Sequence, residues 1–182
     1  SAAMDKGVAI CMDCRHHRME FARAAAEVCA ANGIHVRIFE SLRPTPELSF
    51  AVRHYGCQAG INITASHNPK EYNGYKVYWS DGAQLPPQHA DAIARELEKI
   101  DIFTGVKTMP FDEAKAAGRI ELMGEETDNA FMENVMAMVN DRECVAKVAD
   151  TFHVVYTLPR LRLEAGSPGS AGSGCEAPAL RA

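Results

Sequence analysis

The apolar positions of this chain fall into short runs that alternate with longer periodic stretches. Four short runs rich in Val, Ile and aromatic residues predict strands at residues 7–11, 34–39, 60–63 and 75–79. Stretches with helical periodicity predict helices at residues 18–31, 45–55, 88–100 and 126–139. Strands that alternate with helices form a parallel or mixed sheet covered on both faces. We therefore expect a three-layer α/β/α domain with a mixed, mostly parallel sheet.

Residues that favour helix ends lie beside two of these stretches. Asn32 and Gly33 follow the stretch 18–31 and predict a C-terminal cap. Thr45 precedes Pro46, a residue favoured in the first helical turn, so Thr45 predicts an N-terminal cap.

Several small or flexible apolar residues are expected in the core. One face of the first helical stretch carries Phe21, Ala24, Ala25 and Val28. Cys11 lies in the first predicted strand and Cys29 on an apolar helix face, so both are typical of small core residues. Core packing is also expected for the methionines of the last helical stretch, Met132, Met136 and Met138.

The segment after the third predicted strand is crowded with hydrogen-bonding side chains. It reads Thr64-Ala65-Ser66-His67-Asn68-Pro69. Pro69 disfavours both a continuing strand and a helix before it, so Ser66 is expected in an exposed loop at a strand end. Asn73-Gly74 then predicts a tight turn into the strand at 75–79, which returns Lys76 towards the serine loop. A serine beside a histidine, with a lysine nearby, suits transfer of a group to and from oxygen.

This segment, with Asn73-Gly74-Tyr75-Lys76 after it, resembles the phosphoserine signature of the α-D-phosphohexomutases. That family includes phosphoglucomutases and phosphomannomutases, and residues 72–84 are most similar to the phosphoglucomutase and phosphopentomutase branch. The resemblance covers about residues 7–157. It implies an isomerase in which Ser66 carries a phosphoryl group, donates it to a phosphosugar and recovers it from a bisphosphate intermediate. It also implies that His67 and Lys76 handle protons and contact phosphate.

The chemistry explains why these residue types would be needed. A phosphoserine carries one to two negative charges, which His67, Lys76 and backbone N–H groups in a nest at Asn68 can stabilise. To act as a base, Lys76 must lose its proton, which a desolvated pocket beside other cations favours. Phosphoryl transfer usually needs Mg²⁺. The resemblance implies that the phosphate on Ser66 is one metal ligand, that most other ligands lie outside this chain, and that a bisphosphate such as glucose 1,6-bisphosphate is the activator.

A second loop, at the end of the first predicted strand, contains Asp13 and Arg15. The resemblance implies that these residues face the catalytic cleft and help to bind substrate phosphate; an ordinary ion pair within the loop is the alternative. Cys11 and Cys14 have the C-x-x-C spacing of a redox or zinc site. No second pair at zinc-finger spacing accompanies them, so a metal site is not expected here.

Composition agrees with an ordinary globular protein. The 182 residues are 47% hydrophobic and 24% charged, which are common values. The net charge of −5 argues against nucleic acid or an anionic membrane as the main partner. The partner that the family resemblance implies is a small-molecule phosphosugar. No apolar run approaches the length of a membrane span, and the first residues do not resemble a signal peptide. A cytoplasmic location is therefore expected.

Three parts of the chain are expected. Residues 1–150 correspond to the first domain of the family without its opening strand, and residues 151–157 to the start of a second domain. Residues 158–182 are rich in Gly, Ala, Ser and Pro, which predicts disorder outside the family pattern. A frameshift or a mis-joined gene would explain such a tail. We therefore expect an incomplete, inactive fragment of a phosphosugar mutase.

Other interpretations of the same residues stay open. Ser66, His67 and Lys76 can belong to an ordinary polar turn and a solvated strand. The domain can be a non-catalytic module with a phosphosugar-binding or regulatory role. A serine hydrolase is a further class of function, although a Gly-x-Ser-x-Gly elbow is missing from the sequence. Residues 43–46 can form a phosphate site at a helix N-terminus or a plain turn and cap. Glucose, mannose, pentose and glucosamine phosphates all remain candidate substrates.

Overall fold

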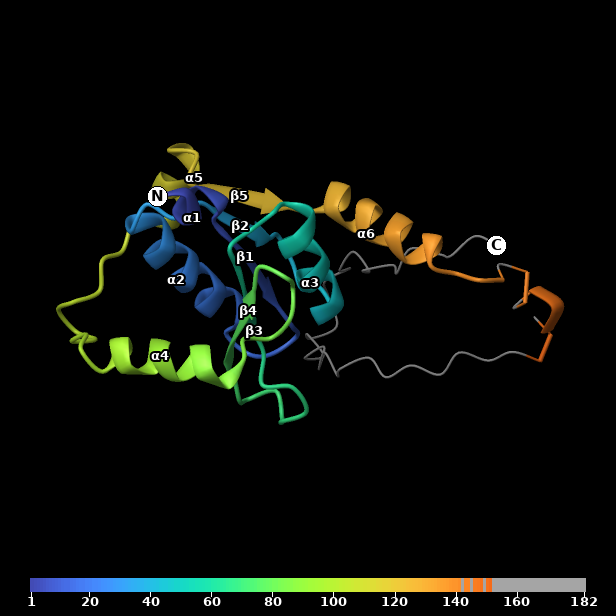
Figure 1. Ribbon diagram of the computed structural model, residues 1–182, viewed down its shortest axis with the longest axis horizontal. Helices are drawn as coiled ribbons and strands as arrows, with labels where there is room; N and C mark the ends of the chain where they lie inside the picture. Colours follow the sequence, from blue (N-terminus) through green and yellow to red (C-terminus); the bar gives the residue numbers. More distant parts are fainter. Residues whose placement is uncertain (142, 145, 149, 152–182) are drawn as a thin grey trace, which may run out of the picture. The chain divides into compact units, whose positions relative to one another are not determined.

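The computed structural model describes residues 1–141, 143–144, 146–148 and 150–151, which belong to one compact unit (Figure 1). The start of a second domain, expected at 151–157, lies outside the described residues except for Thr151, and so does the tail expected at 158–182. No helix in the described part of the chain is both long enough and apolar enough to cross a membrane.

A mixed sheet forms the centre of this unit. Its strands lie in the order β4-β3-β1-β2-β5. The neighbouring pairs β1–β2, β1–β3 and β2–β5 are parallel, whereas β3–β4 is antiparallel. The strand bounds are β1 Val8–Met12, β2 Val36–Phe39, β3 Ala59–Ile63, β4 Tyr75–Trp79 and β5 Ile120–Met123. The expected mixed, mostly parallel sheet is thereby confirmed.

Helices cover both faces of the sheet, as expected. Helix α2 (Arg18–Ala31) lies on one face and α3 (Thr45–His54) on the other (Figure 1). Helix α3 approaches β3 closely at Gly60, where an added Cβ would lie 2.7 Å from a methyl carbon of Val52. Helix α5 (Phe111–Ala116) packs beside α2, and α6 (Glu125–Ala137) packs on α3. The remaining helices are α1 (Ala2–Lys6), α4 (Pro87–Leu97) and the 3₁₀ helix η1 (Ala146–Val148).

The described residues contain four elements that the sequence pattern did not predict, namely α1, α5, β5 and η1. Strand β5 has four residues, of which Ile120 and Met123 are buried while the two between them are exposed. That pattern does not alternate from residue to residue, so it gives no strand signal. Its pairing with β2 comes from the tertiary fold.

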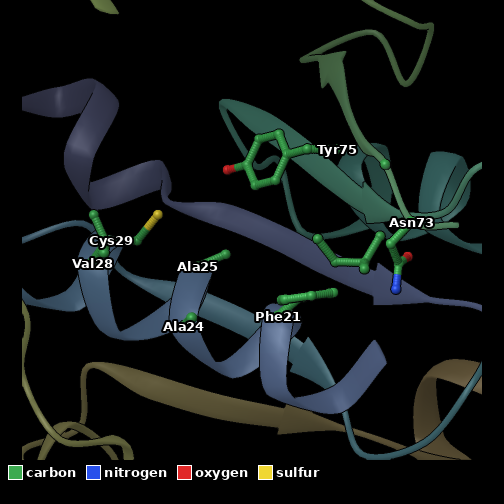
Figure 2. A pocket seen from close by; sticks show the side chains of 9 residues that line it. Phe21, Ala24, Ala25, Val28, Cys29, Asn73 and Tyr75 are labelled. Atoms are coloured by element: carbon green, nitrogen blue, oxygen red, sulfur yellow. The ribbon is translucent and has the colours of Figure 1, made fainter. Parts of the chain in front are cut away.

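The buried face of α2 differs from the predicted one. Its buried residues are Ala22, Ala26 and Ala30, and small side chains there allow the helix to lie close to the sheet. Phe21 is 48% exposed. The four residues expected in the core line an open groove instead (Figure 2). Cys11 is fully buried as expected, whereas Cys29 is half-buried beside the core.

Two further predictions about helices were wrong. The methionines expected in the core are exposed on α6, because this helix packs against α3 through other residues, including Thr127 and Phe131. The N-cap of α3 is Pro44, not Thr45. Thr45 Oγ1 instead accepts a hydrogen bond of 2.9 Å from the side-chain amide of Asn62 on β3. The expected cap at Asn32 and Gly33 is confirmed, with Gly33 at φ +77°.

Candidate functional site: the serine loop

The serine loop lies at the carboxyl edge of the parallel strands. Strands β1 and β3 are adjacent and in register, with Met12 opposite Ile63 at their ends. The chain that follows each strand therefore enters the same region, which is where loops of such sheets usually bind ligands. Asp13 and Arg15 follow β1, and Ser66 follows β3. The expected location of Ser66 beyond a strand end is confirmed.

Ser66 has a strained backbone and an exposed side chain. Its φ is +59°, a left-handed value that non-glycine residues rarely adopt. Its N–H donates to Thr64 Oγ1 at 3.1 Å, and its Oγ lies 2.9 Å from His67 Nδ1. The left-handed residue of the loop is Ser66 rather than Asn68, where a nest was expected. Such strain persists only where surrounding contacts hold it, and it is common at functional sites.

Those surrounding contacts come from Asp13 and Arg15. Asp13 accepts hydrogen bonds from the hydroxyl of Thr64 at 2.6 Å and from Nε of Arg15 at 3.0 Å. Arg15 is only 4% exposed. Its terminal nitrogens donate to four backbone carbonyl oxygens of the loop, those of Ser66, Asn68, Pro69 and Tyr72. Of the two residues that were expected to bind phosphate, Arg15 thus binds the loop backbone, and Asp13 binds Arg15 and the Thr64 hydroxyl.

A second set of contacts fastens the far end of the loop. His16 donates its backbone N–H to the carbonyl oxygen of Lys70 at 3.1 Å. The side-chain amide of Asn73 donates to the carbonyl oxygen of His16 at 2.7 Å. The loop after β1 therefore holds the serine loop at both ends.

Lys76 lies on β4, half-buried, in register opposite Asn62 of β3. The antiparallel pairing brings the start of β4 back to the serine edge of the sheet, as expected. Within the described residues, no hydrogen bond or ion pair joins Lys76 to the serine loop, and Lys76 is among the residues that line a pocket of about 760 Å³ with Gln84 and Leu85. The structure thus brings Ser66, His67 and Asn68 together with the loop after β1, and places Lys76 on the adjoining strand.

The motif at residues 43–46 is tied to a buried charge cluster that the sequence did not reveal. Arg43 donates two hydrogen bonds to the carboxylate of Asp128 on α6, at 2.6 and 2.7 Å. Glu47 is 4% exposed, and its burial, with Asp128 nearby, raises its pKa to about 7 although Arg43 acts in the opposite direction. Because Asp128 lies 85 residues from Arg43, only the fold could show this pairing. The guanidinium of Arg43 is therefore engaged by carboxylates.

The C-x-x-C spacing does not form a reactive centre in the described residues. The thiol of Cys11 is buried and donates to the carbonyl oxygen of Arg43 at 3.2 Å. Burial raises the pKa of Cys11 to about 12, so the nucleophilic thiolate is scarce at neutral pH. Among the described residues there is no cluster of three or more His, Cys, Asp or Glu side chains that could hold a metal.

A groove of about 520 Å³ lies between α2 and the β3–β4 pair (Figure 2). Phe21 and Val28 of α2 line one side, and Tyr75 and Asn73 the other. Lys and Arg are absent from its lining. A phosphate bound there would lose water without gaining a cation, which is unfavourable. The groove is therefore a poor phosphosugar site.

Comparisons with known proteins agree with this geometry. The family model "Phosphoglucomutase/phosphomannomutase, alpha/beta/alpha domain I" matches residues 1–102. A phosphoglucomutase of Staphylococcus saprophyticus is 38% identical over 135 residues, which cover 74% of this chain and 24% of that protein. A phosphoglucomutase of Staphylococcus aureus is 50% identical over 93 residues, covering 51% of this chain and 17% of that protein.

A solved structure is similar to this chain in fold and sequence. The putative phosphomannomutase of Thermus thermophilus aligns with a TM-score of 0.61 and 28% identity, over 73% of this chain and 27% of that one. This chain therefore spans about a quarter of the length of the first of these phosphoglucomutases. With a family model that matches more than half of its residues, the chain belongs to the phosphoglucomutase/phosphomannomutase family and contains its α/β/α domain I.

Proposed function

We propose that this chain supplies the phosphoserine of a phosphosugar mutase, an enzyme that moves a phosphoryl group between two oxygens of one sugar, such as O1 and O6 of glucose. The observation that carries the proposal is the geometry of Ser66. Its hydroxyl is exposed on a loop with left-handed strain and lies 2.9 Å from a histidine nitrogen. A hydroxyl beside a base can accept and release a group through its oxygen.

The proposed cycle conserves every phosphoryl group. With phosphoserine as the starting state, a sugar hydroxyl attacks phosphorus, a new P–O bond to the sugar forms and the P–O bond to Ser66 Oγ breaks. The sugar hydroxyl loses its proton to a base, and Ser66 Oγ gains one. The resulting bisphosphate then returns its other phosphoryl group to Ser66, with the proton movements reversed, and releases the isomeric monophosphate.

Three residues have proposed roles in these steps. His67, hydrogen-bonded to Ser66, exchanges the proton of the serine hydroxyl. Lys76 approaches the same edge on β4 and provides positive charge or a base for the sugar hydroxyl. Asn68 is exposed beside them and offers an amide that can donate to a phosphate oxygen.

Mg²⁺, when bound beside a phosphoserine, would neutralise charge on the transferred group. The described residues do not fit a complete magnesium site, because they contain no cluster of three or more His, Cys, Asp or Glu donors. Asp13, a carboxylate that contacts the loop, is already bound to Thr64 and Arg15. We infer that Mg²⁺ would take only the phosphate oxygen on Ser66 from this part of the chain.

A chimera tests the proposal. The segment of the Staphylococcus saprophyticus phosphoglucomutase that matches this chain is replaced by the residues of this chain, and conversion of glucose 1-phosphate is measured with Mg²⁺ and glucose 1,6-bisphosphate. We expect turnover in the chimera and its loss in Ser66→Ala by a factor of about 10² or more, since the nucleophile is removed. Thermal melting should be unchanged, because substitutions of exposed side chains have small effects on stability.

The same experiment separates the competing functions. A folded chimera that binds glucose 1-phosphate without turnover, and never becomes phosphorylated at Ser66, would indicate a binding module. A hydrolase would require a carboxylate to orient His67, and no ion pair joins His67 to a carboxylate among the described residues. Labelling of Ser66 by a fluorophosphonate probe would favour that class over the mutase.

A further inference from the structure

We propose that Arg15 is a positioning residue, which holds the serine loop in the conformation that presents Ser66 and does not itself bind the substrate phosphate. The inference rests on the proposed function of Ser66 and adds a residue that acts through the loop backbone. The contacts of Arg15, and not its place in a motif, carry the argument.

The guanidinium of Arg15 is surrounded by hydrogen-bond acceptors of this protein. All three of its nitrogens donate hydrogen bonds, one to the carboxylate of Asp13 and the others to loop carbonyl oxygens. A guanidinium has five N–H groups in a fixed plane, and five acceptor atoms of this protein surround this one. Because the side chain is only 5% exposed, a phosphate could reach it only after the loop opened.

The loop is wrapped around this buried cation. Carbonyl oxygens from Ser66 to Tyr72 converge on Arg15, whereas the side chains of Ser66, His67 and Asn68 are exposed. With the carbonyl groups fixed inward, these side chains are left facing solvent, where a substrate can approach. A charge-assisted hydrogen bond is about twice as strong as a neutral one, so several of them can hold a strained backbone. The left-handed Ser66 is thereby explained by contacts from the loop after β1.

Asp13 and Thr64 complete the arrangement. Asp13 binds Arg15 Nε and the Thr64 hydroxyl, and Thr64 Oγ1 accepts the N–H of Ser66. This chain of hydrogen bonds runs from the end of β1 to the backbone of Ser66. Asp13 therefore fixes the plane of the guanidinium and the position of the serine N–H together.

The choice of arginine follows from this geometry. Lysine has one nitrogen and three N–H groups, so it cannot bind Asp13 and the spread of loop carbonyl oxygens at the same time. Lysine would nevertheless preserve the positive charge. Arg15→Lys therefore tests whether the loop needs the planar set of N–H donors or only the positive charge.

Hydrogen exchange of the complete 182-residue chain tests the proposal, because it reads the loop and needs no catalytic activity. The variants are Arg15→Lys, Arg15→Met and, as a control, Arg53→Met on an exposed part of α3. We expect exchange of the amides at residues 64–72 to rise about tenfold or more in both Arg15 variants, the factor that follows from losing one charge-assisted hydrogen bond. Peptides of β1 and β2, and the whole control variant, should match the unsubstituted chain.

Rescue gives a second readout that a general loss of stability would not produce. In Arg15→Ala, guanidinium ion at low millimolar concentration should restore protection of residues 64–72, whereas ethylammonium should not. The proposal is overturned if the loop stays as protected in Arg15→Lys as in the unsubstituted chain. It is also overturned if exchange rises equally throughout the sheet in every Arg15 variant, or if guanidinium fails to restore protection. Failure of the Ser66 chimera would refute the mutase function and leave these exchange results valid.

Discussion

At the scale of single residues, the sequence located the serine loop but not the contacts that shape it. Ser66 could be placed beyond a strand end because an alternating apolar run precedes it and Pro69 follows it. Its left-handed backbone and the burial of Arg15 depend on the direction of several carbonyl groups. Sequence spacing carries no information on those directions, so Arg15 was expected to face the cleft.

The role of Lys76 is the first prediction at this scale. If Lys76 takes a proton from the sugar hydroxyl, arginine cannot replace it, because a guanidinium keeps its charge. In the chimera, Lys76→Arg should lower kcat by about 10²-fold or more while the KM for glucose 1-phosphate changes little. Steady-state assays of glucose 1-phosphate conversion measure both constants.

Lys70→Arg is the matched control, since it makes the same change on the neighbouring loop and should leave kcat nearly intact. If Lys76→Arg retains the kcat of the unsubstituted chimera, Lys76 only supplies positive charge, and its role as a base is excluded.

At the scale of helices and strands, local sequence signals predicted where elements lie, whereas tertiary contacts decided which of their faces are buried. Helix α2 spans the predicted residues 18–31 because a periodic stretch ends at a clear cap. Which face of that helix is buried was predicted wrongly, because a close approach to the sheet favours its alanines over Phe21. Strand β5 was missed because its pairing with β2, and not its own pattern, stabilises it. Periodicity thus located elements more reliably than it assigned their buried faces.

Tertiary contacts hold helix α6 against α3 and the segment before it. Arg43 binds Asp128 near its start, and Tyr55 of the α3 C-cap shares a hydrogen bond of 2.7 Å with Thr127. Glu47 of α3 lies 3.9 Å from Nε of Arg43, so two carboxylates compete for one guanidinium. Glu40, on the preceding segment, also lies 3.9 Å from this guanidinium.

This competition predicts a pH dependence of folding. Burial raises the pKa of Glu47 from 4.5 to about 7, so the folded state binds the proton more tightly than the unfolded state. The penalty for ionising Glu47 is absent below pH 4.5, grows as the pH rises to 7 and is constant above that. Glu47→Gln, a neutral mimic of the protonated acid, should therefore gain Tm over the unsubstituted chain progressively across this range.

Thermal melting at several pH values measures the difference between the two chains. Glu113→Gln, which removes an exposed carboxylate of α5, controls for the loss of one charge. A Tm difference for Glu47→Gln that is the same at the acidic and neutral ends of the range would contradict the assignment of a raised pKa to Glu47.

At the scale of the whole molecule, the residues that form the sheet and its core are not all that a mutase reaction needs. The described residues form a five-stranded sheet with helices on both faces, so this part of the chain has its own core. A mutase must also hold a sugar that carries phosphate at both ends and release it in the reversed orientation. In the proposed function the serine loop exchanges one phosphoryl group at a time, and this chain spans about a quarter of the length of a related phosphoglucomutase. The family and fold could be read from residues 60–79, whereas the sugar preference could not, because no sugar-contacting residue follows from that signature.

The last prediction is that the 182-residue chain alone does not interconvert glucose phosphates. Turnover needs residues that bind the second phosphate of the sugar, and a metal ion that neutralises the negative charge of the transferred phosphoryl group. The described residues contain no cluster of three or more His, Cys, Asp or Glu side chains that could hold such a metal ion. With Mg²⁺ and glucose 1,6-bisphosphate present, conversion of glucose 1-phosphate should not exceed that of the Ser66→Ala chain. The chimera, assayed under the same conditions, is the positive control. Turnover by the chain alone that Ser66→Ala abolishes would show that this domain contains the whole catalytic apparatus.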